Sequence, residues 1–135
     1  MKLVGFIAEG GPRLGVVEGE RLIDLNAVDN RLPGDLAAVL AANDGDLAPL
    51  AALASRAPAS AYRPLEGITY ALPVARPGKI ICLGLNYLEH VKEGPQRDNI
   101  PKYPSIFLRC LSSFTAHEQP LMRPRASEQF DYEAE

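Results

Sequence analysis

Short hydrophobic runs separated by glycine-containing turns occupy the first 25 residues of the chain. The apolar runs lie at residues 3–7, 13–17 and 22–25, and glycine-rich turns lie between them at residues 10–12 and 18–20. Apolar runs of strand length joined by such turns are typical of β-hairpins. The pattern therefore predicts a small antiparallel meander of three strands.

The pattern then changes to segments rich in alanine and leucine that carry helix start signals. Asp35 precedes residues 36–42, and Asp46 precedes residues 47–56. Aspartate is favoured at a helix N-cap because its carboxylate accepts a hydrogen bond from a backbone N–H of the first turn. We therefore predict two short helices, which together with the meander make a small N-terminal α/β domain of residues 1–57.

The second half of the chain has the pattern of a β-rich domain. Residues 58–67 carry prolines and small residues and predict a linker, so the second domain is expected at residues 68–135. Residues 79–85 are almost continuously apolar, which predicts a strand buried on both faces. Residues 94–104 are polar and bounded by prolines, which predicts a mobile loop that could act as a lid. The predicted fold class is α+β, and its other elements are strands at residues 68–72, 105–109, 120–122 and 130–135 and one or two helical turns at residues 86–93.

Composition and charge narrow the class of protein. Of the 135 residues, 47% are hydrophobic and 23% are charged, the formal net charge is −3, and there is no run of Lys or Arg. This balance is typical of a globular protein and argues against binding to nucleic acid. No apolar stretch approaches the roughly 20 residues that a bilayer span needs, so no membrane segment is expected. The two cysteines, Cys82 and Cys110, are expected to be reduced thiols in a cytoplasmic protein.

The first candidate for chemistry is the pair of His90 and Glu93. Residues three apart lie on the same face of a helical turn, so the carboxylate can reach the imidazole. A carboxylate beside an imidazole fixes its tautomer and raises its basicity, which suits a general base. Taken alone, the commoner explanation is a surface pair that stabilises a helix by about 0.2–0.5 kcal/mol.

Glu133 and Glu135 form the second candidate site. Residues two apart on a strand project from the same face, and two close carboxylates repel each other unless a cation lies between them. Oxygen ligands favour Mg²⁺, Mn²⁺ or Ca²⁺ over zinc. Asp131 is on the same face but about 13 Å from Glu135 along an extended strand, so a third ligand has to come from elsewhere in the fold. The alternative is a solvent-exposed acidic strand.

Three further residues are candidates for substrate binding. Arg109 follows a predicted strand, and its guanidinium could hold a carboxylate through two hydrogen bonds, although a solvated arginine is the commoner case. Asn86, at the start of the predicted helical turns, and Ser112, three residues after Arg109, complete the set.

Four segments, in this order and at this spacing, resemble the fumarylacetoacetate hydrolase family. The resemblance is closest to bacterial members such as the 2-hydroxyhepta-2,4-diene-1,7-dioate isomerases. It covers residues 68–135 well, and residues 1–57 are similar to the small N-terminal domain that bacterial members carry. The four segments are residues 79–87, the His90 and Glu93 pair, residues 104–108 and residues 131–135.

The resemblance implies a metal-dependent hydrolase or isomerase whose catalytic domain is a mixed β-sandwich or roll. In the family, a Glu-x-Glu pair, matched by Glu133 and Glu135, binds Mg²⁺ or Mn²⁺ together with a later aspartate. The residues matched by His90 and Glu93 activate water or move a proton. The implied substrate is a 2-oxo acid of aromatic or amino-acid catabolism that reacts through a metal-bound enolate. Hydrolysis, decarboxylation and isomerisation all remain open, and a homodimer is implied for the full-length parent.

Two departures from the family pattern affect this prediction. Arg109-Cys110 stands where members usually carry Lys-Pro, so the positive charge is kept, but arginine cannot donate a proton at neutral pH. The aspartate that completes the family's metal site lies well beyond the Glu-x-Glu pair, whereas this sequence ends at Glu135. We therefore expect the chain to correspond to the first half of such an enzyme. The alternative is a non-catalytic remnant with an incomplete metal site.

Overall fold

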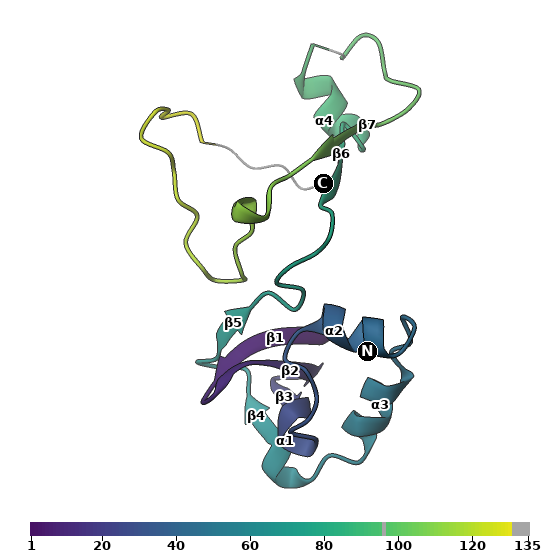
Figure 1. The fold of residues 1–135 in the computed structure, drawn as a ribbon. Coiled ribbons are helices and arrows are strands. Elements are labelled where there is room, and N and C mark those ends of the chain that lie inside the picture. Colours follow the sequence, from purple (N-terminus) through teal and green to yellow (C-terminus); the bar gives the residue numbers. More distant parts are fainter. Residues whose placement is uncertain (96, 131–135) are drawn as a thin grey trace. The chain divides into compact units, whose positions relative to one another are not determined.

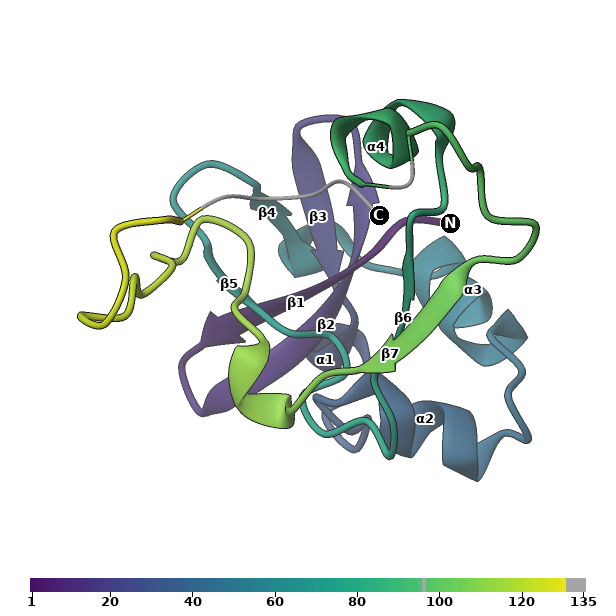
Figure 2. The same ribbon diagram turned by 90° about the horizontal axis from the view of Figure 1, so that it is seen from above.

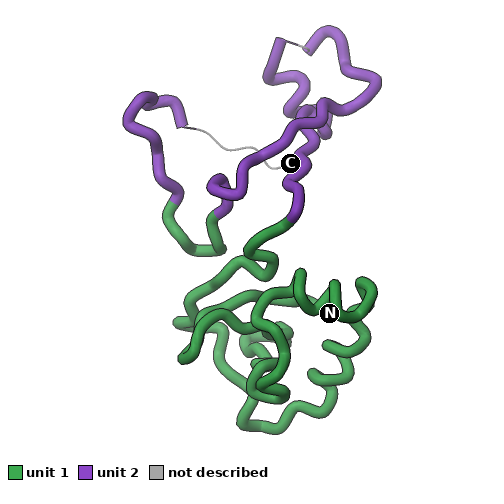
Figure 3. Tube along the Cα trace, in the orientation of Figure 1, with its two compact units in different colours: residues 1–77, 115–120 green, residues 78–114, 121–135 purple. Residues whose placement is uncertain are grey.

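The structure is a computed structural model that describes residues 1–95 and 97–130. The chain divides into two compact units, which Figure 3 shows in different colours. Unit 1 consists of residues 1–77 and 115–120. Unit 2 consists of residues 78–114 and the described residues from 121 onward.

A five-stranded antiparallel sheet forms the centre of unit 1, with the strand order β4-β3-β2-β1-β5 (Figure 1). The first three strands form the predicted meander. Gly10, Gly11 and Gly19 all have positive φ, which lets the chain reverse between these strands without a side-chain clash. The strands are β1 (Leu3–Ala8), β2 (Gly11–Glu18), β3 (Arg21–Asp24), β4 (Tyr62–Pro64) and β5 (Thr69–Ala71).

Both predicted helices form at the expected places. The Asp35 carboxylate accepts a hydrogen bond from the backbone N–H of Ala37 at 2.7 Å, and that of Asp46 accepts one from Ala48 at 2.9 Å. Each carboxylate therefore satisfies a backbone donor that the start of a helix leaves unpaired. The helical elements of unit 1 are α1 (Leu25–Val28), α2 (Leu36–Ala42), α3 (Ala48–Ser55) and the 3₁₀ helix η1 (Ala59–Ala61).

Asp24 is fully buried and links three strands of the sheet. Its Oδ2 accepts hydrogen bonds from Arg13 on β2 at 2.8 Å and from Arg63 on β4 at 3.0 Å. Its Oδ1 accepts the backbone N–H of Ala27 at 3.0 Å and so caps a helical turn. For this reason Leu25, predicted to end the third strand, begins α1 instead.

The hydrophobic core of unit 1 lies between the sheet and its helices. Leu14 and Ile23 of the sheet join Val39 of α2 and Leu50 of α3 in one cluster, and each is at most 1% exposed. Since side chains alternate along a strand, the other residues of β2 and β3 belong to the opposite face of the sheet. Leu22 on that face is also fully buried, so both faces of the sheet are partly covered.

The segment predicted as a linker, residues 58–67, contains regular structure that packs in unit 1. Ala61 in η1 is fully buried, and β4 pairs with β3 as an edge strand, where proline is tolerated. The predicted strand at residues 68–72 forms β5 on the other edge and pairs with β1. Proline and small residues therefore mark a tight turn and an edge strand here rather than a flexible connection. The division of the protein into domains at 1–57, 58–67 and 68–135 stays a prediction.

Among its described residues, unit 2 contains a two-stranded antiparallel sheet and one short helix. They form where the sequence predicts strands at residues 79–85 and 105–109 and helical turns at residues 86–93. The two strands run alongside each other in Figure 2, and Gly84 lies opposite Ser105. The helix follows the first strand, and a 3₁₀ turn follows the second. The elements are β6 (Ile81–Gly84), α4 (Leu88–Glu93), β7 (Ser105–Leu108) and η2 (Leu111–Ser113).

The prediction that residues 79–85 are buried on both faces is wrong for this structure. Ile81 and Leu83 are 59% and 43% exposed. Ile106 and Leu108, which lie opposite them on β7, are 69% and 71% exposed. The apolar run indicated a central strand, but among the described residues of unit 2 its sheet has two strands and no second layer covers this face.

The remaining predicted strands near the end of the chain have different outcomes. Residues 120–122 have no regular structure, so the strand predicted there is wrong. Pro120 lacks the N–H that a strand donates, and Pro124 limits pairing just beyond. Of the strand predicted at residues 130–135, residues 131–135 lie outside the described residues.

The predicted fold class, α+β, is confirmed by an antiparallel sheet with associated helices. Cys82 and Cys110 both have free thiols, as expected. Among the residues that the structure describes, no helix combines the length and apolar character needed to cross a membrane.

Candidate active site

The candidate site lies where the chain turns from β6 into α4, at one end of the β6–β7 sheet (Figure 1). Leu85, the first residue after β6, has φ of +58°. This left-handed conformation costs a residue with a Cβ about 1–2 kcal/mol. Tyr87 then takes the N-cap position of α4 with extended backbone. The turn therefore carries local strain, a feature that is common at functional sites.

His90 and Glu93 come together on α4, as their spacing predicts. Nδ1 of His90 lies 3.6 Å from Oε2 of Glu93, within reach of an ion pair when the ring is protonated but longer than a hydrogen bond. The His90 side chain is 14% exposed, whereas that of Glu93 is 75% exposed. The imidazole is thus largely shielded from water and has a carboxylate at one edge, which suits a group that accepts and returns protons.

Tyr87 is a third member of this group that the sequence analysis missed. Its ring stacks on the imidazole of His90, with the ring centroids 5.3 Å apart and the planes at 28°. This contact could have been predicted from the sequence, because Tyr87 and His90 are three residues apart at the start of a predicted helical turn. The stacked ring restricts rotation of the imidazole and so fixes the edge that it presents to a substrate.

A second charged pair lies on the same helix. Nζ of Lys92 is 3.0 Å from Oε1 of Glu89, and both side chains are at least half exposed. Exposed pairs of this kind contribute little to stability. Glu89 therefore resembles Glu93 in exposure and position on α4 but pairs with a lysine, which makes it a matched control for Glu93.

The predicted substrate-binding residues are not gathered at one place. Asn86 lies in the turn between β6 and α4, one residue before Tyr87, and is exposed. Arg109 follows β7 at the end of the sheet away from α4, where its backbone N–H donates to Ile80 at 3.2 Å. Ser112 lies beyond it in η2. Of the three, only Asn86 is next to the His90 and Glu93 pair.

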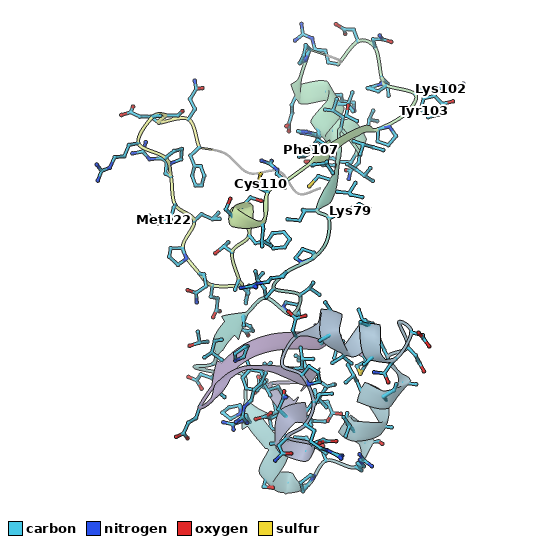
Figure 4. The ribbon with its side chains drawn as sticks, viewed as in Figure 1. Lys79, Lys102, Tyr103, Phe107, Cys110 and Met122 are labelled. Carbon is cyan, nitrogen blue, oxygen red and sulfur yellow. The ribbon has the colours of Figure 1, made fainter. Side chains whose placement is uncertain are left out.

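The side chain of Arg109 contacts an aromatic ring on the strand that precedes it. Its guanidinium carbon lies 5.1 Å from the centroid of the Phe107 ring, at a distance typical of a cation–π contact. Figure 4 labels Phe107 on β7 and Cys110 beyond it. Since β7 runs away from α4, the residues that follow it are separated from His90 by the length of the sheet. The role of Arg109 and Ser112 in substrate binding stays a prediction.

The predicted metal ligands Glu133 and Glu135 lie outside the described residues. Within the described ranges, no three His, Cys, Asp or Glu side chains gather in a way that could hold a metal ion. By donor chemistry, two carboxylates fit a hard divalent cation such as Mg²⁺ or Mn²⁺. The metal site therefore stays a prediction that rests on the sequence.

The loop at residues 94–104 connects α4 to β7 and has no helix or strand at its described positions. Near its end, Nζ of Lys102 lies 5.5 Å from the centroid of the Tyr103 ring, and Figure 4 shows the two side chains together. Tyr103 is 74% exposed. The contact joins two neighbouring residues and does not link the loop to another element, so its predicted mobility and lid role stay predictions.

The segment that contains the candidate site is similar to a known family. Residues 79–135, which include β6, α4 and β7, match the family described as Fumarylacetoacetate (FAA) hydrolase C-terminal. They therefore belong to a domain of this family, and the family predicted from the sequence is confirmed. The narrower resemblance to bacterial isomerases stays a prediction.

Similarity to individual proteins extends over the whole chain. The chain is 36% identical over 140 residues to the oxaloacetate tautomerase FAHD2A, mitochondrial, of Homo sapiens. It is 34% identical over 139 residues to the oxaloacetate tautomerase fahd2, mitochondrial, of Xenopus laevis. It is 32% identical over 138 residues to the fumarylacetoacetate hydrolase domain-containing protein 2 homolog of Dictyostelium discoideum. Each alignment covers 100% of this chain but only 43%, 42% and 44% of the respective relative. The chain thus spans less than half the length of these relatives.

Proposed function

We propose that this protein belongs to an enzyme that moves a proton at the carbon next to the carbonyl of a 2-oxo acid. The reaction that we favour is keto–enol tautomerisation of a 2-oxo dicarboxylate. The observation that carries the proposal is the shielded His90 imidazole beside Glu93, within the segment that matches the family. The names of the relatives point to the same chemistry, since two of those described above are called oxaloacetate tautomerases.

In the proposed reaction, His90 exchanges protons with the substrate. The neutral imidazole takes a proton from C3, and the electron pair of that C–H bond moves to form the enolate. The imidazolium then gives a proton to the 2-oxo oxygen, so that the keto acid becomes its enol and the imidazole is neutral again. The reverse direction returns a proton to C3 and removes one from the enol oxygen. Nδ1 of His90 faces Glu93, so we assign the exchange with the substrate to Nε2 on the other side of the ring.

Glu93 and Tyr87 act on the imidazole rather than on the substrate. The Glu93 carboxylate, 3.6 Å away, stabilises the imidazolium that forms while the proton is held. The Tyr87 ring keeps the imidazole plane in place. Glu133 and Glu135 would hold the divalent cation, which when bound polarises the 2-oxo group. Hydrolysis and decarboxylation pass through the same kind of enolate, so the assignment to tautomerisation rests on the names of the relatives.

The test compares two glutamates on the same helix. Purified protein is mixed with enol oxaloacetate and Mn²⁺, and the loss of enol absorbance is followed. We expect Glu93→Gln to slow the enzymatic rate by about tenfold or more, because the imidazolium loses its carboxylate. The matched change Glu89→Gln removes the same charge one turn earlier and should leave the rate unchanged.

Two negative results of this test would lead to different conclusions. Equal rates for the two variants would refute a proton-transfer role for the His90 and Glu93 pair. No rate above background for a folded unsubstituted chain would overturn the proposal for this chain. It would support the alternative of a non-catalytic remnant with an incomplete metal site.

We also propose that the protein acts in the cytoplasm as a homodimer on small molecules, rather than on nucleic acid or a membrane. The net charge of −3 and the lack of a Lys or Arg run argue against nucleic acid as the binding partner. The four exposed aliphatic side chains on one face of β6 and β7 offer an apolar surface for a subunit contact.

A further inference from the structure

Unit 1 contains a cavity that plays no part in the proposed reaction. Its volume is about 410 Å³, and it lies against β1, β2 and β5 and the segment at residues 115–120, all within unit 1. Ligand sites in proteins commonly have volumes of about 300–1,000 Å³. The cavity is therefore large enough for a small organic molecule.

The cavity lies on the face of the sheet opposite the helices. Leu3 pairs with Val16, which belongs to the core cluster under the helices, so the alternate residues Val4 and Val17 belong to the other face. Both line the cavity, together with Leu72, which follows β5. The floor is thus formed by aliphatic side chains from neighbouring parts of the sheet.

One wall of the cavity is aromatic. Tyr70 on β5 lines it and contacts His117 edge to face, with the ring centroids 4.6 Å apart and the planes at 80°. His117 comes from the segment at residues 115–120 and is 70% exposed, with its Nε2 3.7 Å from Oε1 of Glu118. The tyrosine hydroxyl and the imidazole place two hydrogen-bonding groups at the edge of an apolar floor.

Lys2 supplies a positive charge at the rim. Its backbone carbonyl accepts the N–H of Val17 at 2.9 Å, which fixes the start of β1 against the end of β2. Lys2 lines the cavity, and no acidic residue is among the described residues that line it. The charge of this rim therefore favours an anion, while the floor favours an apolar body.

We propose that this cavity binds a small organic acid with an apolar or aromatic body, whose carboxylate pairs with Lys2. The body would lie over Val4, Val17 and Leu72, and Tyr70 and His117 would form its side wall. The ligand differs from the small, polar 2-oxo acid of the proposed reaction. The cavity is thus a second site, in the unit that does not contain His90.

The probe for this site is naphthalene-2-carboxylate, with naphthalene-2-methanol as a neutral molecule of similar shape. Each is titrated into the ¹⁵N-labelled full chain, and backbone amide shifts are followed by NMR. We expect saturable shifts at β1 and β5, with the carboxylate bound about fivefold more tightly than the alcohol, the size of one exposed ion pair.

Two lysine variants test whether the positive charge of Lys2 pairs with the carboxylate of the ligand. Lys2→Gln should weaken carboxylate binding by about fivefold, to the level of the alcohol, and leave alcohol binding unchanged. Lys79→Gln is the control, because Lys79 is also exposed but lies in unit 2. It should change neither affinity. Equal affinity for the carboxylate and the alcohol in the unsubstituted chain, or an unchanged carboxylate affinity in Lys2→Gln, would overturn the proposal.

A cavity-filling variant tests the location. Ala116 is half-buried and lines the cavity from the segment at residues 115–120, so Ala116→Phe should abolish saturable shifts for both probes. Shifts confined to the exposed face of β6 and β7 would also overturn the proposal, since they would show only non-specific contact with apolar surface. Because none of these readouts uses catalysis, failure here is distinguishable from failure of the proposed reaction.

Discussion

Replacement of Asp24 by asparagine should destabilise unit 1 substantially. The side chain is fully buried, and its Oδ2 is shared by Arg13 and Arg63, which come from the strands on either side of β3. Asparagine has nearly the same size and can still cap α1 at Ala27. The substitution therefore removes the negative charge while leaving the shape and the cap in place.

The expected loss in the free energy of unfolding follows from the two charge-assisted hydrogen bonds that Asp24 accepts. Such a bond contributes about 1.5–3 kcal/mol, and breaking a fully buried pair costs about 3–5 kcal/mol. The arginine side chains are 26% and 45% exposed, so water can partly solvate them once the partner is gone. We therefore expect Asp24→Asn to lower the free energy of unfolding by about 2–3 kcal/mol. Asp24→Ala also loses the cap and should cost about 1 kcal/mol more.

The assay is urea unfolding followed by far-UV circular dichroism, because the chain has no tryptophan to report by fluorescence. Asp44→Asn is the control. Asp44 is exposed and has φ of +50°, a conformation that asparagine tolerates, so its free energy of unfolding should change by less than about 0.5 kcal/mol. A change of the same small size for Asp24→Asn would refute the view that this buried charge holds the sheet together.

Two further predictions concern unit 1, the first with a control at Gly78, the first residue of unit 2. A Cβ at Gly5 would lie 2.7 Å from the carbonyl oxygen of Ala71, so Gly5→Ala should cost about 1–3 kcal/mol in urea unfolding. Gly78→Ala, with no heavy atom within 4 Å of the added carbon, should cost nothing or stabilise slightly, and equal losses would contradict the packing argument. Hydrogen bonds from the Arg31 side chain and backbone lower the pKa of Asp29 from 3.8 to about 2. This contact therefore stabilises the fold above pH 3.8 and is lost as the pH falls through 2, so NMR titration should find the low value and Arg31→Ala should move it towards 3.8.

Local signals in the sequence predicted much of the fold. Asp35 is the N-cap of α2, as predicted, whereas the N-cap of α3 is Leu47, one residue after Asp46, whose carboxylate still accepts the N–H of Ala48. Such signals are predictable because a capping carboxylate acts on the next two or three residues and depends little on the rest of the chain. Glycine turns likewise marked the meander. Asp24 was missed as a cap for the opposite reason. It ends an apolar run that reads as a strand, and its buried position depends on Arg13 and Arg63, which are distant in sequence.

In the candidate site, only the contacts between residues that are close in sequence could be predicted. The pairing of His90 with Glu93 follows from helical spacing, and the stacking of Tyr87 on His90 could have been inferred from the same rule. The separation of Arg109 from this group depends on the antiparallel pairing of β6 with β7, which sets the direction of the chain after the sheet. Exposure of Ile81 was also unpredictable, because an apolar run does not show whether a second layer covers it.

The central claim is that His90 moves a proton at C3 of a 2-oxo acid. The most direct measurement is exchange of the C3 hydrogens of a 2-oxo dicarboxylate for deuterium, followed by ¹H NMR in D₂O with Mn²⁺ at catalytic concentration. It detects removal and return of the C3 proton, the step that tautomerisation requires, without waiting for a final product to accumulate. The account predicts exchange above background that falls by about 10²-fold or more in His90→Gln and is unchanged in Lys92→Gln, an exposed position on the same helix. Exchange that persists in His90→Gln at the rate of the unsubstituted chain would contradict it.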